Sequence, residues 1–229
     1  MCDKTNSDKS PIVENGISIV AIKDLDGCNF RVPNYQRGYR WTRQQVKDLI
    51  DDIFEFTHNF FKNGQKGIYC IQPLVVQKSH NEEGTDCWDV IDGQQRLTTL
   101  FVILKFFDRH LYGLQYQTRV QSADYLNRLA DHLYAEEQKL DNIDFYHMYE
   151  AFEEVSSKLN GYKDLDKFEE VLLSKVKFIW YAIDGSQNPI DVFTRLNIGK
   201  ISLTPSELIK ALLLNRNNFG SEQDFDKIH

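Results

Sequence analysis

The chain has 229 residues, of which 41% are hydrophobic and 13% aromatic, so it can build a sizeable core and overall disorder is not expected. The formal net charge of -7 excludes a general basic coat for DNA, and any contact with nucleic acid or a nucleotide must be local. The cysteines show no C-x-x-C spacing, which argues against zinc or a disulfide framework, and no apolar run reaches membrane-spanning length. We therefore expect a soluble, cytoplasmic protein with no membrane partner.

The first part of the chain predicts two short elements and then a long helix. Residues 1–11 form a flexible lead-in, residues 17–25 fit either a strand or a short helix, and residues 29–32 predict a strand. Thr42 and Gln45 form a capping-box pattern that begins the helix. The buried face of this helix is expected to hold Val46, Leu49, Ile50, Ile53, Phe60 and Phe61.

Two neighbouring strands and a second helix come next. Residues 68–77 predict a central strand, in which Pro73 requires an edge position or a bulge. Residues 88–91 predict its neighbour in the sheet, ended by the turn Asp92-Gly93. Helical spacing then follows at Leu97, Leu100, Phe101, Leu104, Phe107 and Leu111.

The turn at residues 92–96 has the composition of a phosphate-binding turn. A helix N-terminus offers unpaired N–H groups and the positive end of its dipole. Gly93 allows close backbone approach, the two glutamines that follow can donate or accept, and Arg96 offers a planar fork suited to phosphate. A plain turn, capped by Asp92 and with Arg96 lying along the surface, explains the same residues equally well.

The second half of the chain predicts an acidic helical region and then a strand that returns to the first sheet. Residues 108–170 are helical, and their excess of acidic residues indicates a solvated face. Helical spacing occurs at Val120, Ala123, Ala130, Leu133 and Tyr134, and again at Phe145, Tyr149, Phe152, Val155 and Leu159. Residues 176–183 predict the returning strand. Pro189 opens a short helix through Leu196, and Thr204–Glu207 is a capping box for a last helix.

Charge placement supports a local anion site. Three windows contain no Asp or Glu, namely residues 32–47, 93–107 and 192–206. Their basic residues are Arg37, Arg40, Arg43, Lys47, Arg96, Lys105, Arg195 and Lys200. If the fold brings the windows together, they form a cationic pocket suited to a polyphosphate. Taken singly, each arginine is better explained by a surface ion pair.

Three motifs, in order along the chain, carry a family resemblance. They are Val-Pro-Asn-Tyr-Gln-Arg-Gly-Tyr-Arg-Trp at 32–41, Val-Ile-Asp-Gly-Gln-Gln-Arg-Leu-Thr-Thr-Leu at 90–100, and Phe-Thr-Arg-Leu-Asn-Ile-Gly-Lys-Ile-Ser-Leu-Thr-Pro-Ser-Glu-Leu-Ile-Lys at 193–210. Together they resemble the N-terminal domain of GmrSD-type restriction proteins, known for the DGQQR motif. The resemblance implies an α+β fold, a ParB/sulfiredoxin-like small mixed sheet with an attached helical region. Residues 12–229 would form one domain, divided into a core (12–110), a helical insertion (111–175) and a returning strand with C-terminal helices (176–229).

The resemblance also implies an activity, Mg²⁺-dependent binding and hydrolysis of a nucleoside triphosphate (ATP, GTP or another NTP) in a bacterial restriction or phage-defence system that recognises modified DNA. By position it assigns catalysis to Asp92, Gln94, Gln95 and Arg96, with Asp92 as the metal ligand. It assigns nucleotide binding to Gln36, Arg37, Arg40, Gly93, Arg96, Asn197, Gly199 and Lys200.

Departures from the family pattern and two alternatives shape the expected partners. Sulfiredoxins carry a cysteine in the equivalent turn, where this chain has Gln94 and Gln95, so thiol repair is not expected. Many relatives continue into an HNH nuclease domain that this sequence lacks. The expected partners are therefore a nucleotide, modified DNA and an HNH nuclease in a longer parent protein or a separate chain, while oligomerisation stays open. The alternatives are a nucleotide-gated DNA- or protein-binding module without catalysis, and direct DNA binding through the arginine–aromatic stretch at 32–41.

Overall fold

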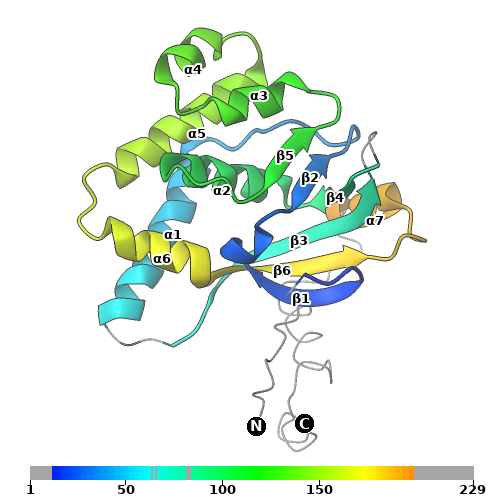
Figure 1. Cartoon of the computed structure of the whole chain (residues 1–229), viewed down its shortest axis with the longest axis horizontal. Helices are drawn as coiled ribbons and strands as arrows, with labels where there is room; N and C mark the ends of the chain where they lie inside the picture. The colour runs from blue at the N-terminus through cyan, green and yellow to red at the C-terminus, as the bar shows by residue number, and fades with distance from the viewer. Residues whose placement is uncertain (1–11, 63, 65, 81–83, 199–229) are drawn as a thin grey trace, which may run out of the picture.

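A six-stranded mixed sheet organises the protein (Figure 1). The computed structural model describes residues 12–62, 64, 66–80 and 84–198, and every structural statement below concerns these residues. The strands are β1 (Gly16–Ala21), β2 (Asn29–Val32), β3 (Tyr69–His80), β4 (Asp86–Asp92), β5 (Gly113–Tyr116) and β6 (Val176–Ile183). Their order in the sheet is β1-β6-β3-β4-β2-β5. Neighbours are antiparallel in β1–β6 and β3–β4 and parallel in β3–β6, β2–β4 and β2–β5. The expected α+β class is confirmed.

Helices cover the sheet unequally. They are η1 (Ile22–Leu25), α1 (Arg43–Lys62), α2 (Gln94–Phe106), α3 (Gln121–Asn127), α4 (His132–Gln138), α5 (Ile143–Leu159), α6 (Leu165–Ser174) and α7 (Pro189–Ile198). Helices α1 to α6 gather on one side of the sheet (Figure 1). Leu74 and Val76 of β3 belong to the main core on that side, whereas Val75 between them packs with Val192 and Phe193 of α7. Because side chains alternate along a strand, α7 covers the opposite face.

Strand β3 is central, and its proline is accommodated by a bulge. The register with β6 shifts between Ile71 and Pro73, so the missing proline N–H falls where the ladder is already irregular. A second shift, between Val75 and Val76, occurs against β4. The expected bulge is therefore confirmed.

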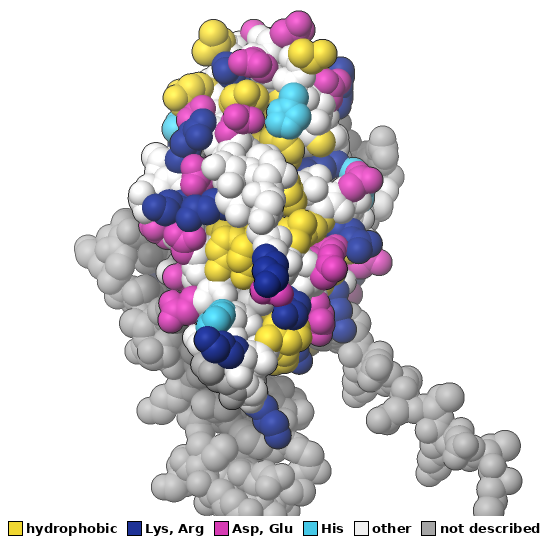
Figure 2. All heavy atoms as spheres, turned by 90° about the vertical axis from the view of Figure 1, so that its left-hand side faces the viewer, with side chains coloured by type: hydrophobic (Ala, Val, Ile, Leu, Met, Phe, Trp, Pro, Cys, Tyr) yellow, Lys and Arg dark blue, Asp and Glu magenta, His cyan; other side chains and the backbone are white. Residues whose placement is uncertain are grey.

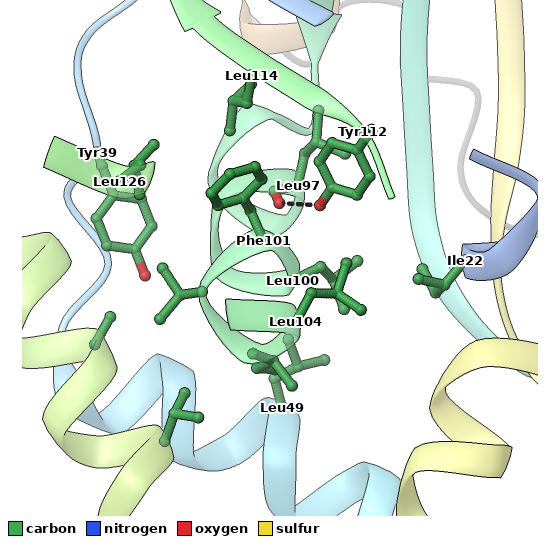
Figure 3. Close-up of a cluster of buried hydrophobic side chains, with 14 of the residues drawn as sticks. Ile22, Tyr39, Leu49, Leu97, Leu100, Phe101, Leu104, Tyr112, Leu114 and Leu126 are labelled. Carbon is green, nitrogen blue, oxygen red and sulfur yellow. Dashed lines mark hydrogen bonds between the residues drawn. The ribbon is translucent and has the colours of Figure 1, made fainter. Parts of the chain in front are cut away.

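Helix α2 is buried on nearly all sides rather than along one stripe. All residues from Leu97 to Lys105 are buried, and Figure 3 shows Ile22, Tyr39 and Leu49 approaching the helix from different directions. The helix lies between the sheet and the outer helices, so it needs no polar face. It ends at Phe106, and Leu111, expected on its apolar face, lies beyond it.

Other predicted elements are confirmed or corrected by long-range packing. The helices that became α1, α5 and α7, and the returning strand β6, are confirmed, while residues 17–25 form both a strand and a 3-10 turn. Phe61 is 40% exposed because the end of α1 projects past the sheet (Figure 1). The helical pattern at 120–134 is two short helices, since Asp131 caps α4 by accepting from the Tyr134 N–H at 3.3 Å.

Three further outcomes concern the second half of the chain. Strand β5 was not expected within the helical region, and it pairs in parallel with β2. Helix α6 was not predicted as a separate helix from the spacing of apolar residues. The capping box at 204–207 and the lead-in at 1–11 lie outside the described residues. Among the helices of the described ranges, none combines the length and apolarity needed to cross a bilayer.

Candidate functional site

The β4–α2 turn forms an uncapped helix N-terminus. Gly93 precedes the helix in a left-handed conformation (φ 97°) and provides no side-chain cap. A Cβ there would lie 3.0 Å from the Pro73 carbonyl oxygen, so the turn also requires glycine for space. The first turn of α2 contains no acidic residue, and the backbone N–H groups of its first three residues have no acceptor within the part of the chain that the structure describes. The turn therefore presents free donors and a positive dipole end.

The two glutamines of the motif bind the protein's own loop. The Gln94 Nε2 donates to the Arg37 carbonyl at 3.1 Å, and the Gln95 Nε2 donates to the Gly38 carbonyl at 2.9 Å. The Gln95 Oε1 accepts from the Arg40 N–H at 2.8 Å, and also from the next N–H at 3.2 Å. Both side chains thus fix loop 33–42 against the start of α2. The Gln94 Oε1 is buried without a partner among the described residues.

Gln36 strengthens the same attachment from the loop side. Its side chain is buried, and its Nε2 donates to the carbonyl of Val90 and, at 3.1 Å, to that of Ile91. The loop is therefore bonded both to the end of β4 and to the beginning of α2. Tyr39 is fully buried and its hydroxyl bonds to Thr99 at 2.9 Å, so it belongs to the core.

The guanidinium of Arg96 is hydrogen-bonded within the protein. Its Nη1 donates to the Gln72 Oε1 at 2.8 Å, and its Nη2 donates to the Pro73 carbonyl at 2.7 Å and contacts Asp92 at 3.4 Å. Burial lowers the pKa of Arg96, with Asp92 opposing the shift. The fork expected to hold phosphate instead joins α2 to the bulge of β3. The Nε of Arg96 is buried without a partner among the described residues.

Asp92 and Arg37 are the accessible charges beside the turn. Asp92 ends β4, and 43% of its side chain is exposed. Arg37 is exposed, and its guanidinium makes no hydrogen bond or ion pair with any residue that the structure describes. Within the described ranges no three His, Cys, Asp or Glu side chains cluster as metal ligands, so Asp92 stands as a lone carboxylate at the turn.

The third window reaches the first one through an aromatic contact. Tyr35 and Phe193 of α7 lie with ring centroids 5.4 Å apart. Burial raises the pKa of Tyr35 to about 12, and its hydroxyl has no partner among the described residues. Asn197 lies in the last turn of α7, where the structure describes its backbone but not its side chain. Gly199 and Lys200 lie beyond the described residues. All three windows therefore approach the end of β4. Of the cations in the third window, Arg195 lies exposed on α7, whereas Lys200 lies beyond the described residues.

Arg40 faces away from the turn and toward a second cluster. Its Nη1 bonds to the buried Asp144 of α5, whose other oxygen pairs with the Arg119 Nε at 2.7 Å. Gly38 lies so close to Asp144 that any Cβ there would overlap the carboxylate. Sequence reasoning missed Asp144 and Arg119 because each lies about 80 to 105 residues from its loop partner. An acid in the first turn of α5 is explained by dipole compensation alone, so it carries no sequence signal for a buried ion pair.

The charges on the helical side of the molecule are mixed. Figure 2 shows Lys and Arg side chains interspersed with Asp and Glu on this side, with no broad basic area on the face shown. This face therefore lacks the charge pattern of a general DNA-binding surface.

Comparison with known families gives a match over most of the chain. The family model described as "GmrSD restriction endonuclease, N-terminal domain" matches residues 19–214. The matched range contains the loop at 32–41, the β4–α2 turn and α7. No curated protein matches the chain.

Proposed function

Because this chain belongs to the family of GmrSD restriction endonuclease N-terminal domains, we propose that it is the nucleotide-binding and NTP-hydrolysing part of a system that restricts modified DNA in phage defence. A nucleoside triphosphate is the proposed ligand of the β4–α2 turn. Modified DNA and an HNH nuclease are the proposed partners through which turnover controls restriction.

The observation that carries the proposal is the uncapped N-terminus of α2. Its first N–H groups have no acceptor among the described residues, its first turn has no acid, and Arg37 is exposed beside it. Such a helix end binds phosphate oxygens through backbone donors and the dipole. The bonds from Gln94 and Gln95 hold the loop that carries Arg37, so the cation is positioned before the ligand arrives.

The residues of the turn then take different roles. Arg37 neutralises charge on the phosphates, while Gln94, Gln95 and Arg96 act as positioning residues because their side chains already bind the protein. Phosphoryl transfer depends mainly on such positioning and on charge neutralisation.

Asp92 suits a magnesium ion that is held mainly by the substrate. Mg²⁺ commonly takes one or two carboxylates and completes its shell with waters and substrate phosphates. Asp92 is a half-exposed carboxylate whose contact to Arg96 is long, at 3.4 Å, so oxygen lone pairs remain for the metal. When bound, the ion would be held in part by Asp92 and would offset negative charge on the phosphates.

A two-part assay tests the proposal. Binding of non-hydrolysable ATP and GTP analogues with Mg²⁺ is measured by calorimetry, and phosphate release is measured with each triphosphate, with and without modified DNA. Arg37→Gln is expected to weaken analogue binding about tenfold, since it removes a charge-assisted contact. The matched control is Arg43→Gln, because Arg43 lies in the same window but pairs with Glu150 at 2.5 Å. Equal loss of analogue binding in both variants, or no analogue binding by the wild type, would refute the assignment of Arg37 and the β4–α2 turn to the nucleotide.

One observation favours a second function, a nucleotide-gated binding module without catalysis. The guanidinium of Arg96 is engaged by Gln72 and Pro73, so of Arg37 and Arg96 only Arg37 has a guanidinium without a partner among the described residues. Nucleotide binding with no phosphate release under any of the conditions above would establish this second function and exclude hydrolysis.

A further inference from the structure

A cavity lies beside Asp144, and loop 33–42 contributes Arg40 to its wall. Its volume is about 530 Å³, and its walls are residues 118–122, the beginning of α5 at 142–144, and Arg40. Pockets that bind small organic molecules typically have volumes of about 300–1,000 Å³. The cavity is therefore large enough for an organic ligand and larger than inorganic phosphate needs.

The charged groups of the cavity do not balance. Arg40 and Arg119 share a single carboxylate, that of Asp144, so the three side chains carry a net charge of +1. The side chain of Asp144 is 4% exposed, which leaves it little contact with water. The positive field also reaches the next turn of α5, where desolvation and then the Arg40 charge lower the pKa of His147. An anion that enters the cavity meets a cationic wall.

Donors remain free on both arginines. The Arg40 Nη1 donates to the Tyr39 carbonyl and to Asp144. The Arg119 Nε pairs with Asp144, and the Arg119 Nη1 donates to the Gln36 carbonyl at 3.5 Å. The Nε and Nη2 of Arg40 and the Nη2 of Arg119 have no partner within the residues that the structure describes. Because Asp144 and the loop fix both guanidinium groups, these donors are held in place before any ligand binds.

Two residues that line the cavity are apolar and exposed. Val120 is 78% exposed and Ile143 is 53% exposed, although both are large hydrophobic residues. Both line the cavity. Isolated exposed apolar residues need no explanation, but here two of them flank the same cationic wall from different elements. The site thus offers an apolar surface next to fixed cationic donors.

We propose that this cavity binds a small organic molecule that carries an oxyanion group, with the oxyanion on Arg40 and Arg119 and the apolar part against Val120 and Ile143. The inference does not depend on the nucleotide proposal, since Arg37 and Asp92 do not line this cavity. It assigns Arg40 to the cavity rather than to the nucleotide.

Phenyl phosphate is a suitable probe because it joins a dianion to an apolar ring. Binding is measured by calorimetry on the full chain, with inorganic phosphate and phenol as comparison probes. The wild type is expected to bind phenyl phosphate more tightly than either comparison probe. In the same titration the pKa of His147, followed by NMR, is expected to rise when the anion offsets the Arg40 charge.

Two variants and two controls locate the binding. Arg119→Gln is expected to weaken phenyl phosphate binding about tenfold or more. Ile143→Glu places a negative charge beside the cavity and leaves the cap bonds from Asn142 to the Asp144 and Phe145 N–H groups in place. It too is expected to weaken binding. Arg109→Gln removes an exposed arginine that pairs with Glu169 at 2.7 Å, outside the cavity, and is expected to bind normally. Arg37→Gln should also bind normally.

Several results would overturn the proposal. One is wild-type binding of phenyl phosphate no tighter than that of inorganic phosphate. Another is unchanged binding in both Arg119→Gln and Ile143→Glu. A third is loss of binding in Arg37→Gln with retention in Arg119→Gln, which would place the probe at the motif turn instead. These outcomes leave the nucleotide proposal intact, because that proposal is judged by triphosphate analogues and Arg37 alone.

Discussion

Substitution of Gln95 by alanine tests whether the motif glutamines hold the loop. The change removes the donor to the Gly38 carbonyl, at 2.9 Å, and the acceptor for the N–H groups of Arg40 and Trp41, at 2.8 and 3.2 Å. Each net hydrogen bond contributes about 1 kcal/mol, and a buried group left without a partner costs about 1–3 kcal/mol. Gly38 is buried whereas the other two residues are half-buried and partly reached by water. The expected loss in the free energy of unfolding is therefore about 3 kcal/mol.

Urea denaturation, followed by far-UV circular dichroism, measures this loss. The matched control is Gln44→Ala, because Gln44 is an exposed glutamine whose side chain, among the described residues, bonds only to Asp48, at 2.6 Å. It should change stability by less than about 0.5 kcal/mol. If Gln95→Ala loses no more free energy of unfolding than this control, Gln95 does not hold the loop against α2. The nucleotide would then remain the better explanation for the presence of Gln95 at the turn.

Two further predictions concern the Asp144 cluster. Gly38→Ala is expected to destabilise the fold by about 2–3 kcal/mol, because the new Cβ would overlap the buried Asp144 carboxylate. The control is Gly185→Ala, whose Cβ would meet no described residue within 4 Å. Equal stability of the two variants in urea would contradict the close packing at Gly38. Desolvation, followed by the charge of Arg40, lowers the pKa of His147 from 6.5, so the unfolded chain binds the proton more tightly and stability falls as pH drops below about 6.5. NMR titration should show this pKa moving upward in Arg40→Gln, and unfolding between pH 5 and 7 should depend less on pH in His147→Gln than in the wild type.

The sequence predicted the strand–turn–helix around the motif because the signals are local. Asp92-Gly93 interrupts an apolar strand, and the helical spacing begins within a few residues, so β4 and α2 follow from neighbouring side chains alone. The roles of the turn residues did not follow in the same way. Gln95 bonds to groups 54 to 57 positions away, and Arg96 bonds to carbonyl and amide oxygens 23 and 24 positions away. No local pattern shows whether such a side chain faces a ligand or the protein itself.

The same reason explains the elements that were missed. Strand β5 has four residues, and only its parallel pairing with β2 makes it a strand. The Asp144 cluster depends on how α5 is laid over loop 33–42, which is decided by core packing rather than by the residues around Asp144. The acid-free windows at 32–47 and 93–107 do meet, because loop 33–42 is bonded to Gln94 and Gln95 at the start of α2. They did not distinguish Arg37, which is exposed, from Arg40, which is paired.

Gly93 offers a last prediction that separates backbone strain from contact. Gly93 and Gly27 both have positive φ, at 97° and 76°, but of the two only Gly93 has close neighbours among the described residues. A Cβ on Gly93 would lie 3.0 Å from the Pro73 oxygen and 3.3 Å from the Arg96 Nη2. A left-handed conformation costs an alanine about 1 kcal/mol, so Gly27→Ala should lose about that amount.

Gly93→Ala should lower the free energy of unfolding by about 2–3 kcal/mol, because the bulge of β3 must also shift to make room for the Cβ. Because the Arg96 fork depends on that carbonyl, Gly93→Ala should weaken nucleotide binding as well, whereas Gly27→Ala should not. Equal stability losses in the two variants, measured by urea denaturation, would show that the turn can move away from β3. In that case the bonds of Arg96 would not fix the geometry of the helix N-terminus, and the proposed anion site would lack the rigid support on which its preorganisation rests.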